Sequence, residues 1–170
     1  GNVEGVAAVD QNEGALSNAR EFLGLRSDQC YTDVEQALRE NKADFCAIVV
    51  PLAFHEMVVD LALKYDLHIL SEKPIADSLE ASVRIAAKVK QAGKKMAVTM
   101  SHRFDQDKTT LRRELRSGSY GTLDYLAMRF TCDCRKFASW GKFRHEIADP
   151  LLVEGAVHHL DILADMAGAK

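Results

Sequence analysis

The sequence predicts an α/β protein built on a parallel, doubly wound sheet, and three observations carry that prediction. Apolar strand-like segments alternate with amphipathic helix-like segments over residues 5–100, as in successive βαβ units. Residues 43–50 are almost all apolar, which is typical of a parallel strand covered on both faces. The apolar residues 67–70 lead into Glu72-Lys73-Pro74, which places a lysine at the carboxyl edge of the sheet, where open α/β sheets bind ligands.

The first fifty residues predict two strands and two helices. Residues 5–10 indicate a buried strand, and apolar residues at helical spacing over 15–23 indicate a helix that Gly24 would cap. A short helix follows around residues 34–38. The next predicted strand is the apolar segment 43–50.

Residues 54–100 continue the alternation. A helix is expected over residues 54–65, and after the lysine motif Asp77 and Glu80 match a capping box for a helix that ends near Gly93. Residues 96–100 indicate one more strand. The apolar faces expected for the two helices are Phe54, Met57, Val58, Leu61, Ala62 and Tyr65 in the first, and Leu79, Val83, Ala86 and Ala87 in the second.

The pattern changes after residue 101. A helix is expected around Leu111 and Leu115, a strand over residues 123–131, and a loop over residues 132–149. A final amphipathic helix follows Pro150, with Val157, Leu160 and Leu163 as its apolar face.

Two domains are therefore expected. Residues 1–102 would form a partial Rossmann-like domain, and residues 103–170 would form the beginning of an α+β domain. The length of 170 residues suits one domain, or one domain and part of another.

The glycine-rich turn that opens a typical Rossmann domain is missing. No G-x-G-x-x-G occurs in the sequence, and in strand order 3-2-1-4-5-6 the missing first strand would lie between the strands predicted for residues 5–10 and 43–50. Its absence would leave buried backbone groups unpaired, at roughly 1–3 kcal/mol each. We expect a fragment of a longer protein, truncated at both ends. A smaller α/β protein with rearranged strands is the alternative.

Charge and hydropathy argue against nucleic acid and membrane partners. The formal net charge is -3, and the basic residues Arg112, Arg113 and Arg116 surround Glu114 as on a solvated helix face. No apolar run approaches the roughly 18–20 residues of a membrane span, and no signal peptide is recognisable. A soluble cytoplasmic protein is expected.

The four cysteines do not form a zinc pattern. Cys132 and Cys134 would need two further ligands, for which His145 is one weak candidate, and Cys46 lies in an apolar strand. We expect neither a metal site nor a disulfide framework.

A second motif complements the lysine. Residues 154–161 place His158 where a base could face Lys73 across a cleft. A lysine and a histidine at one cleft suit removal of a proton from a hydroxyl while hydride leaves the carbon, which is alcohol dehydrogenase chemistry.

In their order and spacing these motifs resemble the Gfo/Idh/MocA family of NAD(P)-dependent oxidoreductases, which includes glucose–fructose oxidoreductase and inositol dehydrogenases. The resemblance covers nearly the whole chain. It is carried by Val9-Asp10, Tyr31-Thr32-Asp33, Ala43-Asp44, Val50-Pro51 with His55, Glu72-Lys73-Pro74, His102-Arg103-Phe104, Gly118 with Gly121, and Gly155 with His158 and Asp161.

The resemblance implies roles for individual residues. Lys73 corresponds to the catalytic lysine and His158 to the catalytic acid/base. Asp10 corresponds to the acidic residue that binds the adenosine ribose, which favours NAD over NADP because a carboxylate repels a 2′-phosphate. The other positions that line the cofactor are Pro51, His55 and Glu72.

The same resemblance implies the reaction and the partners. Hydride would pass between nicotinamide and a secondary hydroxyl of a sugar, cyclitol or related polyol, in a parent protein that is a homodimer or homotetramer. Glu154 stands where family members that oxidise such substrates often carry aspartate. Glu154 and Asp161 share a helical stripe with His158 and are the candidates for substrate binding. The alternatives are a non-catalytic, ligand-binding relative and a truncated piece without activity of its own.

Overall fold

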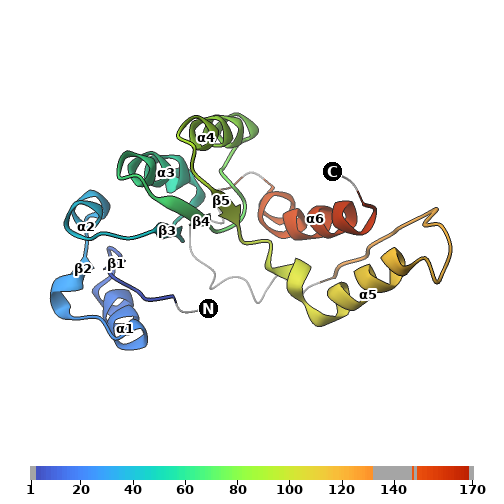
Figure 1. Ribbon diagram of the computed structural model, residues 1–170, viewed down its shortest axis with the longest axis horizontal. Helices are drawn as coiled ribbons and strands as arrows, with labels where there is room; N and C mark the ends of the chain where they lie inside the picture. Colours follow the sequence, from blue (N-terminus) through green and yellow to red (C-terminus); the bar gives the residue numbers. More distant parts are fainter. Residues whose placement is uncertain (1–2, 132–146, 148, 169–170) are drawn as a thin grey trace. The chain divides into compact units, whose positions relative to one another are not determined.

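The computed structural model describes residues 3–131, 147 and 149–168. Two compact units make up the chain, Gly1–Ala97 and Val98–Lys170 (Figure 1). No helix in the described part is long and apolar enough to cross a membrane.

Unit 1 contains two small sheets. In the first, β1 (Ala8–Val9) runs parallel to β2 (Cys30–Tyr31), a strand that the sequence did not predict. In the second, β3 (Phe45–Ile48) runs parallel to β4 (His68–Ser71), and β5 (Met96–Val98) lies on the other side of β4. Within the described residues no pairing joins β1 to β3. The break between the sheets lies where the sequence predicts that a strand is missing.

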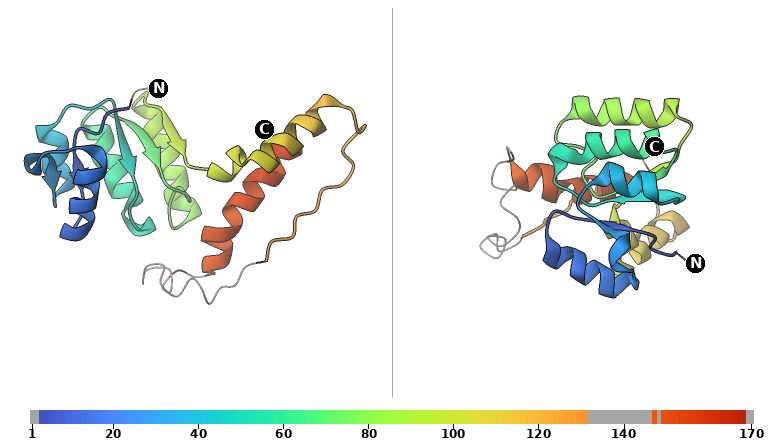
Figure 2. Two further views of the ribbon diagram at one scale, coloured as in Figure 1. Left: turned by 90° about the horizontal axis from the view of Figure 1, so that it is seen from below. Right: turned by 90° about the vertical axis from the view of Figure 1, so that its left-hand side faces the viewer.

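Four helices connect these strands. They are α1 (Glu13–Leu23), α2 (Val34–Glu40), α3 (His55–Lys64) and α4 (Leu79–Gln91). Helices α2, α3 and α4 lie side by side (Figure 2). A 3-10 turn, η2 (Leu52–Phe54), leads into α3, and a second 3-10 turn, η1 (Ser27–Gln29), precedes β2.

The helix ends follow their local sequence. Helix α1 begins after Asn12, whose side chain accepts from two backbone N–H groups, and ends at Gly24, where φ is 67°. A positive φ of this kind costs glycine little because it has no Cβ. Helix α4 is capped by Ser78, whose hydroxyl accepts from the N–H of Ala81, and so the predicted cap at Asp77 was wrong by one residue.

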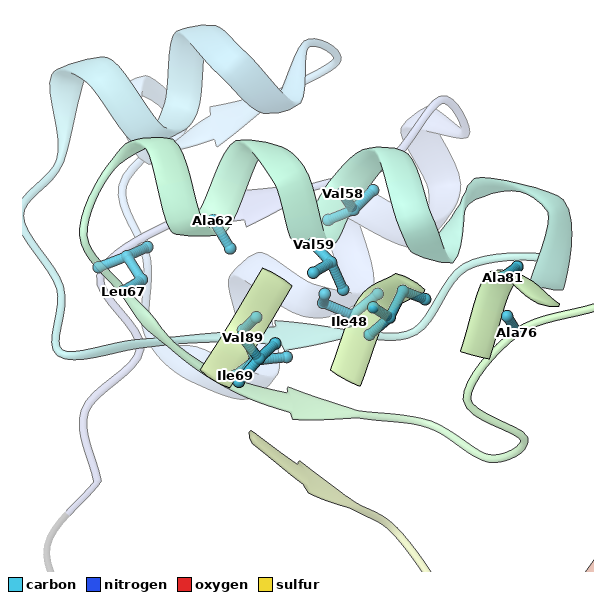
Figure 3. Close-up of a cluster of buried hydrophobic side chains, with 10 residues drawn as sticks. Ile48, Val58, Val59, Ala62, Leu67, Ile69, Ala76, Ala81 and Val89 are labelled. Carbon is cyan, nitrogen blue, oxygen red and sulfur yellow. The ribbon is translucent and has the colours of Figure 1, made fainter. Parts of the chain in front are cut away.

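The core of unit 1 lies between the second sheet and helices α3 and α4. Figure 3 shows its side chains, among them Ile48 of β3 and Val59 and Ala62 of α3. Ile85 of α4 belongs to the same cluster. These four side chains are at most 1% exposed. Burying such groups removes apolar surface from water, which is the main favourable term in folding.

The predicted apolar faces of α3 and α4 were partly wrong. Helix α4 buries Ala81, Ile85 and Val89, whereas Leu79 is 76% exposed. Met57 of α3 is 50% exposed. The buried residues of α4 lie at i, i+4 and i+8 on one face of the helix, which is not the face that the predicted set defined.

Two predicted strands are less buried than expected. The strand predicted over residues 5–10 is reduced to Ala8–Val9 and is not buried, since Val9 is 37% exposed. In β3, Ile48 is buried while Phe45 is 38% exposed, so only one face is covered. Helices α3 and α4 contact one face of this sheet, and β3 has no strand on its outer side within the described residues.

Unit 2 is helical in its described part. It contains a 3-10 segment η3 (Ser101–Phe104), helix α5 (Gln106–Ser117) and helix α6 (Ala156–Met166), which follows a π-helical turn η6 (Leu151–Gly155). Helix α5 contacts α6, and η3 contacts both helices.

Two expectations for unit 2 were wrong. Residues 123–131 form no strand, because a strand needs a hydrogen-bonded neighbour and this segment pairs with none of the described residues. Helix α6 buries His158, Ile162 and Met166, whereas the predicted core residue Leu160 is 60% exposed.

Candidate functional site

The loop that carries Lys73 leaves the sheet at the carboxyl end of β4. Ser71 ends that strand and is fully buried, and the N–H of Glu72 donates to the carbonyl oxygen of Ile48, the last residue of β3, at 2.8 Å. Glu72 and Lys73 are half-buried, and the Lys73–Pro74 peptide bond is cis. The Glu72 carboxylate accepts from the N–H of Lys73 at 3.2 Å. The lysine therefore follows a strand end that is hydrogen-bonded to its neighbour.

Pro51 and His55 lie at the same edge of the sheet. Pro51 precedes the turn η2, and His55 opens α3 with a side chain that is 0% exposed. The imidazole Nε2 is 2.9 Å from the carbonyl oxygen of Val50, and Nδ1 is 3.1 Å from that of Ile75. The predicted residues Pro51, His55, Glu72 and Lys73 are thus brought together where β3 and β4 end.

Asp10 lies at the end of β1, in the other sheet of unit 1. Its N–H donates to the carbonyl oxygen of Tyr31 at 3.1 Å, which extends the pairing of β1 with β2. Its carboxylate is exposed and accepts from the N–H of Asn12 at 2.8 Å. An exposed carboxylate at the carboxyl end of a parallel strand is able to accept hydrogen bonds from the hydroxyls of a ribose.

Helix α6 of unit 2 presents His158. The side chain is 8% exposed, and its ring stacks on that of His102 with 4.0 Å between centroids and 14° between planes. His159 faces another way: its Nδ1 is 3.1 Å from the carbonyl oxygen of Gly155, and its ring contacts Phe130. Of the two adjacent histidines, His158 stacks on His102 of η3, whereas His159 meets the same ring edge-on with 6.3 Å between centroids.

Asp161 is held by Arg103. The guanidinium donates to both carboxylate oxygens, at 2.5 and 2.6 Å, in the planar two-bond geometry that arginine favours. These hydrogen bonds raise the pKa of Arg103 above its ordinary value. Glu154, the other substrate-binding candidate, lies in the turn before α6 and is 7% exposed.

Asp165 collects a second group of arginines. It accepts from Arg112 at 2.8 Å and from Arg116 at 3.1 Å, and Arg103 lies 3.6 Å away. The hydrogen bond from Arg112 is the main reason that the pKa of Asp165 lies below its ordinary value. The expectation of a solvated face was therefore wrong for Arg112, whose side chain is 22% exposed, whereas the side chains of Arg113 and Arg116 are 74% and 58% exposed.

Two features of these sites were not predicted from the sequence. The stacking of His102 on His158 joins residues far apart in the sequence, and no spacing rule predicts it. Ser71 directly precedes the lysine motif, and its position at the end of a predicted strand could have identified it as a residue of the site.

Residues 3–131, 147 and 149–168 include no group of three metal-ligating side chains. The weak metal candidates Cys132, Cys134 and His145 lie outside those residues.

A family model and several curated relatives match the chain. Residues 2–100 match the Gfo/Idh/MocA model, described as an oxidoreductase family with an NAD-binding Rossmann fold. The uncharacterized protein y4oX of Sinorhizobium fredii is 56% identical over 99% of this chain and 47% of its own length. Inositol 2-dehydrogenase of Corynebacterium glutamicum is 32% identical over 84% of this chain and 40% of its own length. The chain thus spans less than half of the length of these relatives.

A solved structure agrees with the fold. The myo-inositol 2-dehydrogenase of Lactobacillus plantarum superposes with a TM-score of 0.85, over 98% of this chain and 49% of that one, at 22% identity. At that identity the likeness concerns the fold. With the family match over more than half of its residues, this chain belongs to the Gfo/Idh/MocA family of oxidoreductases, which have an NAD-binding Rossmann fold.

Proposed function

We propose that the full-length protein containing this chain is an NAD-dependent dehydrogenase that oxidises a secondary hydroxyl of a sugar, cyclitol or related polyol. The observation that carries the proposal is Lys73 at the carboxyl end of β4, in a chain of this oxidoreductase family. The relative named inositol 2-dehydrogenase supports the substrate class.

In the proposed reaction, Lys73 and His158 act on the substrate hydroxyl. His158 accepts the hydroxyl proton, and the carbon loses its hydrogen with the electron pair, so that a carbonyl forms. Lys73 donates a hydrogen bond to the same oxygen and stabilises the negative charge that develops on it. Histidine suits the base role because its ordinary pKa lies near neutral pH.

The residues of unit 1 fit the cofactor that the family implies. NAD, when bound, supplies the nicotinamide carbon that accepts the hydride. The exposed Asp10 carboxylate would hold the adenosine ribose, and it favours NAD over NADP because it repels a 2′-phosphate. Pro51 and Glu72 would line the cofactor at the edge where β3 and β4 end, and His55 would lie next to them with its ring fully buried.

The first test replaces the lysine. We expect Lys73→Met in the full-length protein to lower kcat at least ~10²-fold, because it removes the hydrogen bond to the reacting oxygen. The measurement is NADH absorbance with a panel of inositols, glucosides and other polyols. Near-normal turnover by this variant would exclude the catalytic assignment.

Lys64→Met is the matched control. Lys64 lies on α3, its side chain is 60% exposed, and it pairs with Glu35 on the surface. The same chemical change there should leave turnover close to that of the wild type. A comparable loss in both variants would point to an effect on folding.

A second candidate function is a ligand-binding relative without hydride transfer. Glu154 favours it, because its side chain is one methylene longer than the aspartate of many family members and is nearly buried. NADH binding by the full-length protein without oxidation of any polyol in the panel would support this candidate.

A further inference from the structure

The His55 side chain connects the end of β3 to the loop that carries Lys73. The ring is fully buried, with Nε2 2.9 Å from the carbonyl oxygen of Val50 and Nδ1 3.1 Å from that of Ile75. Val50 lies two residues after β3, and Ile75 directly follows Lys73-Pro74. One imidazole ring therefore lies between the segment that follows β3 and the residue on the C-terminal side of Lys73-Pro74.

The near side of the loop is held as well. Ser71 Oγ is 3.5 Å from His55 Nδ1 and donates to the carbonyl oxygen of Glu72 at 3.1 Å. The N–H of Glu72 donates to Ile48 in β3 at 2.8 Å. Lys73 is thus flanked by backbone groups that are anchored before it and after it.

The ring chemistry makes the contact with Ile75 specific. A carbonyl oxygen only accepts hydrogen bonds, and a neutral imidazole carries one N–H. The ring therefore holds the loop in the tautomer with the proton on Nδ1, and it donates to both carbonyls only when both nitrogens are protonated. A side chain that keeps a donor at the Nδ1 position would keep this connection. A side chain that keeps a donor only at the Nε2 position would keep the connection to Val50 and release the loop.

We propose that His55 is a positioning residue for Lys73: it fixes the loop of residues 72–75 so that the lysine amine meets the substrate oxygen. The proposal rests on the proposed function, in which Lys73 acts on that oxygen. Reacting groups must be held closely, and a displacement of about 1 Å can cost roughly 10²-fold in rate. The role differs from a direct contact with the cofactor, which would appear in the KM for NAD.

The variants His55→Asn and His55→Gln separate the contact with Ile75 from the contact with Val50. The amide of asparagine reaches the position of Nδ1, and that of glutamine reaches the position of Nε2. In the full-length protein we expect His55→Gln to lower kcat by roughly 10- to 100-fold, with the KM for NAD within about threefold of the wild type. His55→Asn should recover most of the lost turnover, because it retains a donor toward Ile75.

Three results would overturn the proposal. Equal losses of kcat in both variants would indicate general damage to the site. A raised KM for NAD with normal kcat would indicate a cofactor contact. Normal turnover in His55→Gln would show that the loop holds Lys73 without the ring.

Two controls keep these outcomes distinct. Val59→Ala, on the same helix and 0% exposed, should lower thermal stability while leaving kcat nearly unchanged below its unfolding temperature. Lys73→Met in the same assay separates the two proposals. If it is active, the proposed function fails; if it is inactive while His55→Gln is normal, only the role of His55 fails.

Discussion

The two units of this chain are held together by different forces. Unit 1 packs ten buried apolar residues from β3, β4, α3, α4 and their connections into one cluster. In the described part of unit 2, the buried apolar side chains are Ile162 and Met166, and arginine–aspartate pairs join α6 to η3 and α5. Apolar burial is insensitive to moderate salt, whereas partly exposed ion pairs are weakened by it. The stability of the two units should therefore respond to different conditions.

The largest expected effect is in unit 1. Ile85→Ala removes a side chain that is 0% exposed and leaves a cavity, so it should cost about 2–5 kcal/mol of unfolding free energy. Hydrogen exchange of the full-length protein should show faster exchange of α3 and α4 amides while α6 is unchanged. Val83→Ala is the control on the same helix, because Val83 is 60% exposed and its loss should cost under about 0.5 kcal/mol.

A smaller effect is expected in unit 2. Asp165→Asn removes the charge that pairs with Arg112 and Arg116, and it should cost about 1–2 kcal/mol. Exchange should then accelerate in α6 and leave α4 unchanged. Added salt should also accelerate hydrogen exchange in α6 of the wild type. Acceleration in α4 as well would contradict the separation of the two units.

The smallest effect is an acid dependence of the same pair. Arg112 holds the pKa of Asp165 below its ordinary value in the folded state. The carboxylate therefore stabilises unit 2 fully above its unfolded pKa, near 4, and the contribution is lost as the pH falls through the lower folded pKa. The difference in α6 protection between wild type and Asp165→Asn should be constant from about pH 5 to 7 and shrink below about pH 4. If the difference in α6 protection were constant at every pH, the Asp165 carboxylate could not be its origin.

Much of the architecture could be predicted from the sequence because its signals are local. Gly24 ends α1 and Gly118 ends α5 with positive φ, and the apolar strand β4 leads directly into Lys73. Where a helix was predicted from the spacing of apolar residues along the chain, the helix lies close to its predicted position.

The remaining features depend on tertiary contacts. Leu79 has the greater hydrophobicity, yet Ala81 packs in the core because it shares a helix face with Ile85 and Val89, and that face packs against the rest of unit 1. The strand expected over 123–131 had suitable composition and no pairing partner in the described residues. At the candidate site, the bridge made by His55 depends on the meeting of β3 and the lysine loop, which no periodicity encodes.

Strand β3 also has a consequence for handling this stretch of chain. Among the described residues it is one of the two outer strands of its sheet, and Phe45 and the following Val49 are 38% and 75% exposed. An open strand edge beside apolar side chains is a template on which extended segments of other molecules add, as in aggregation and domain swapping. A preparation limited to these 170 residues should therefore self-associate as its concentration rises, through the same strand that helps to anchor the lysine loop.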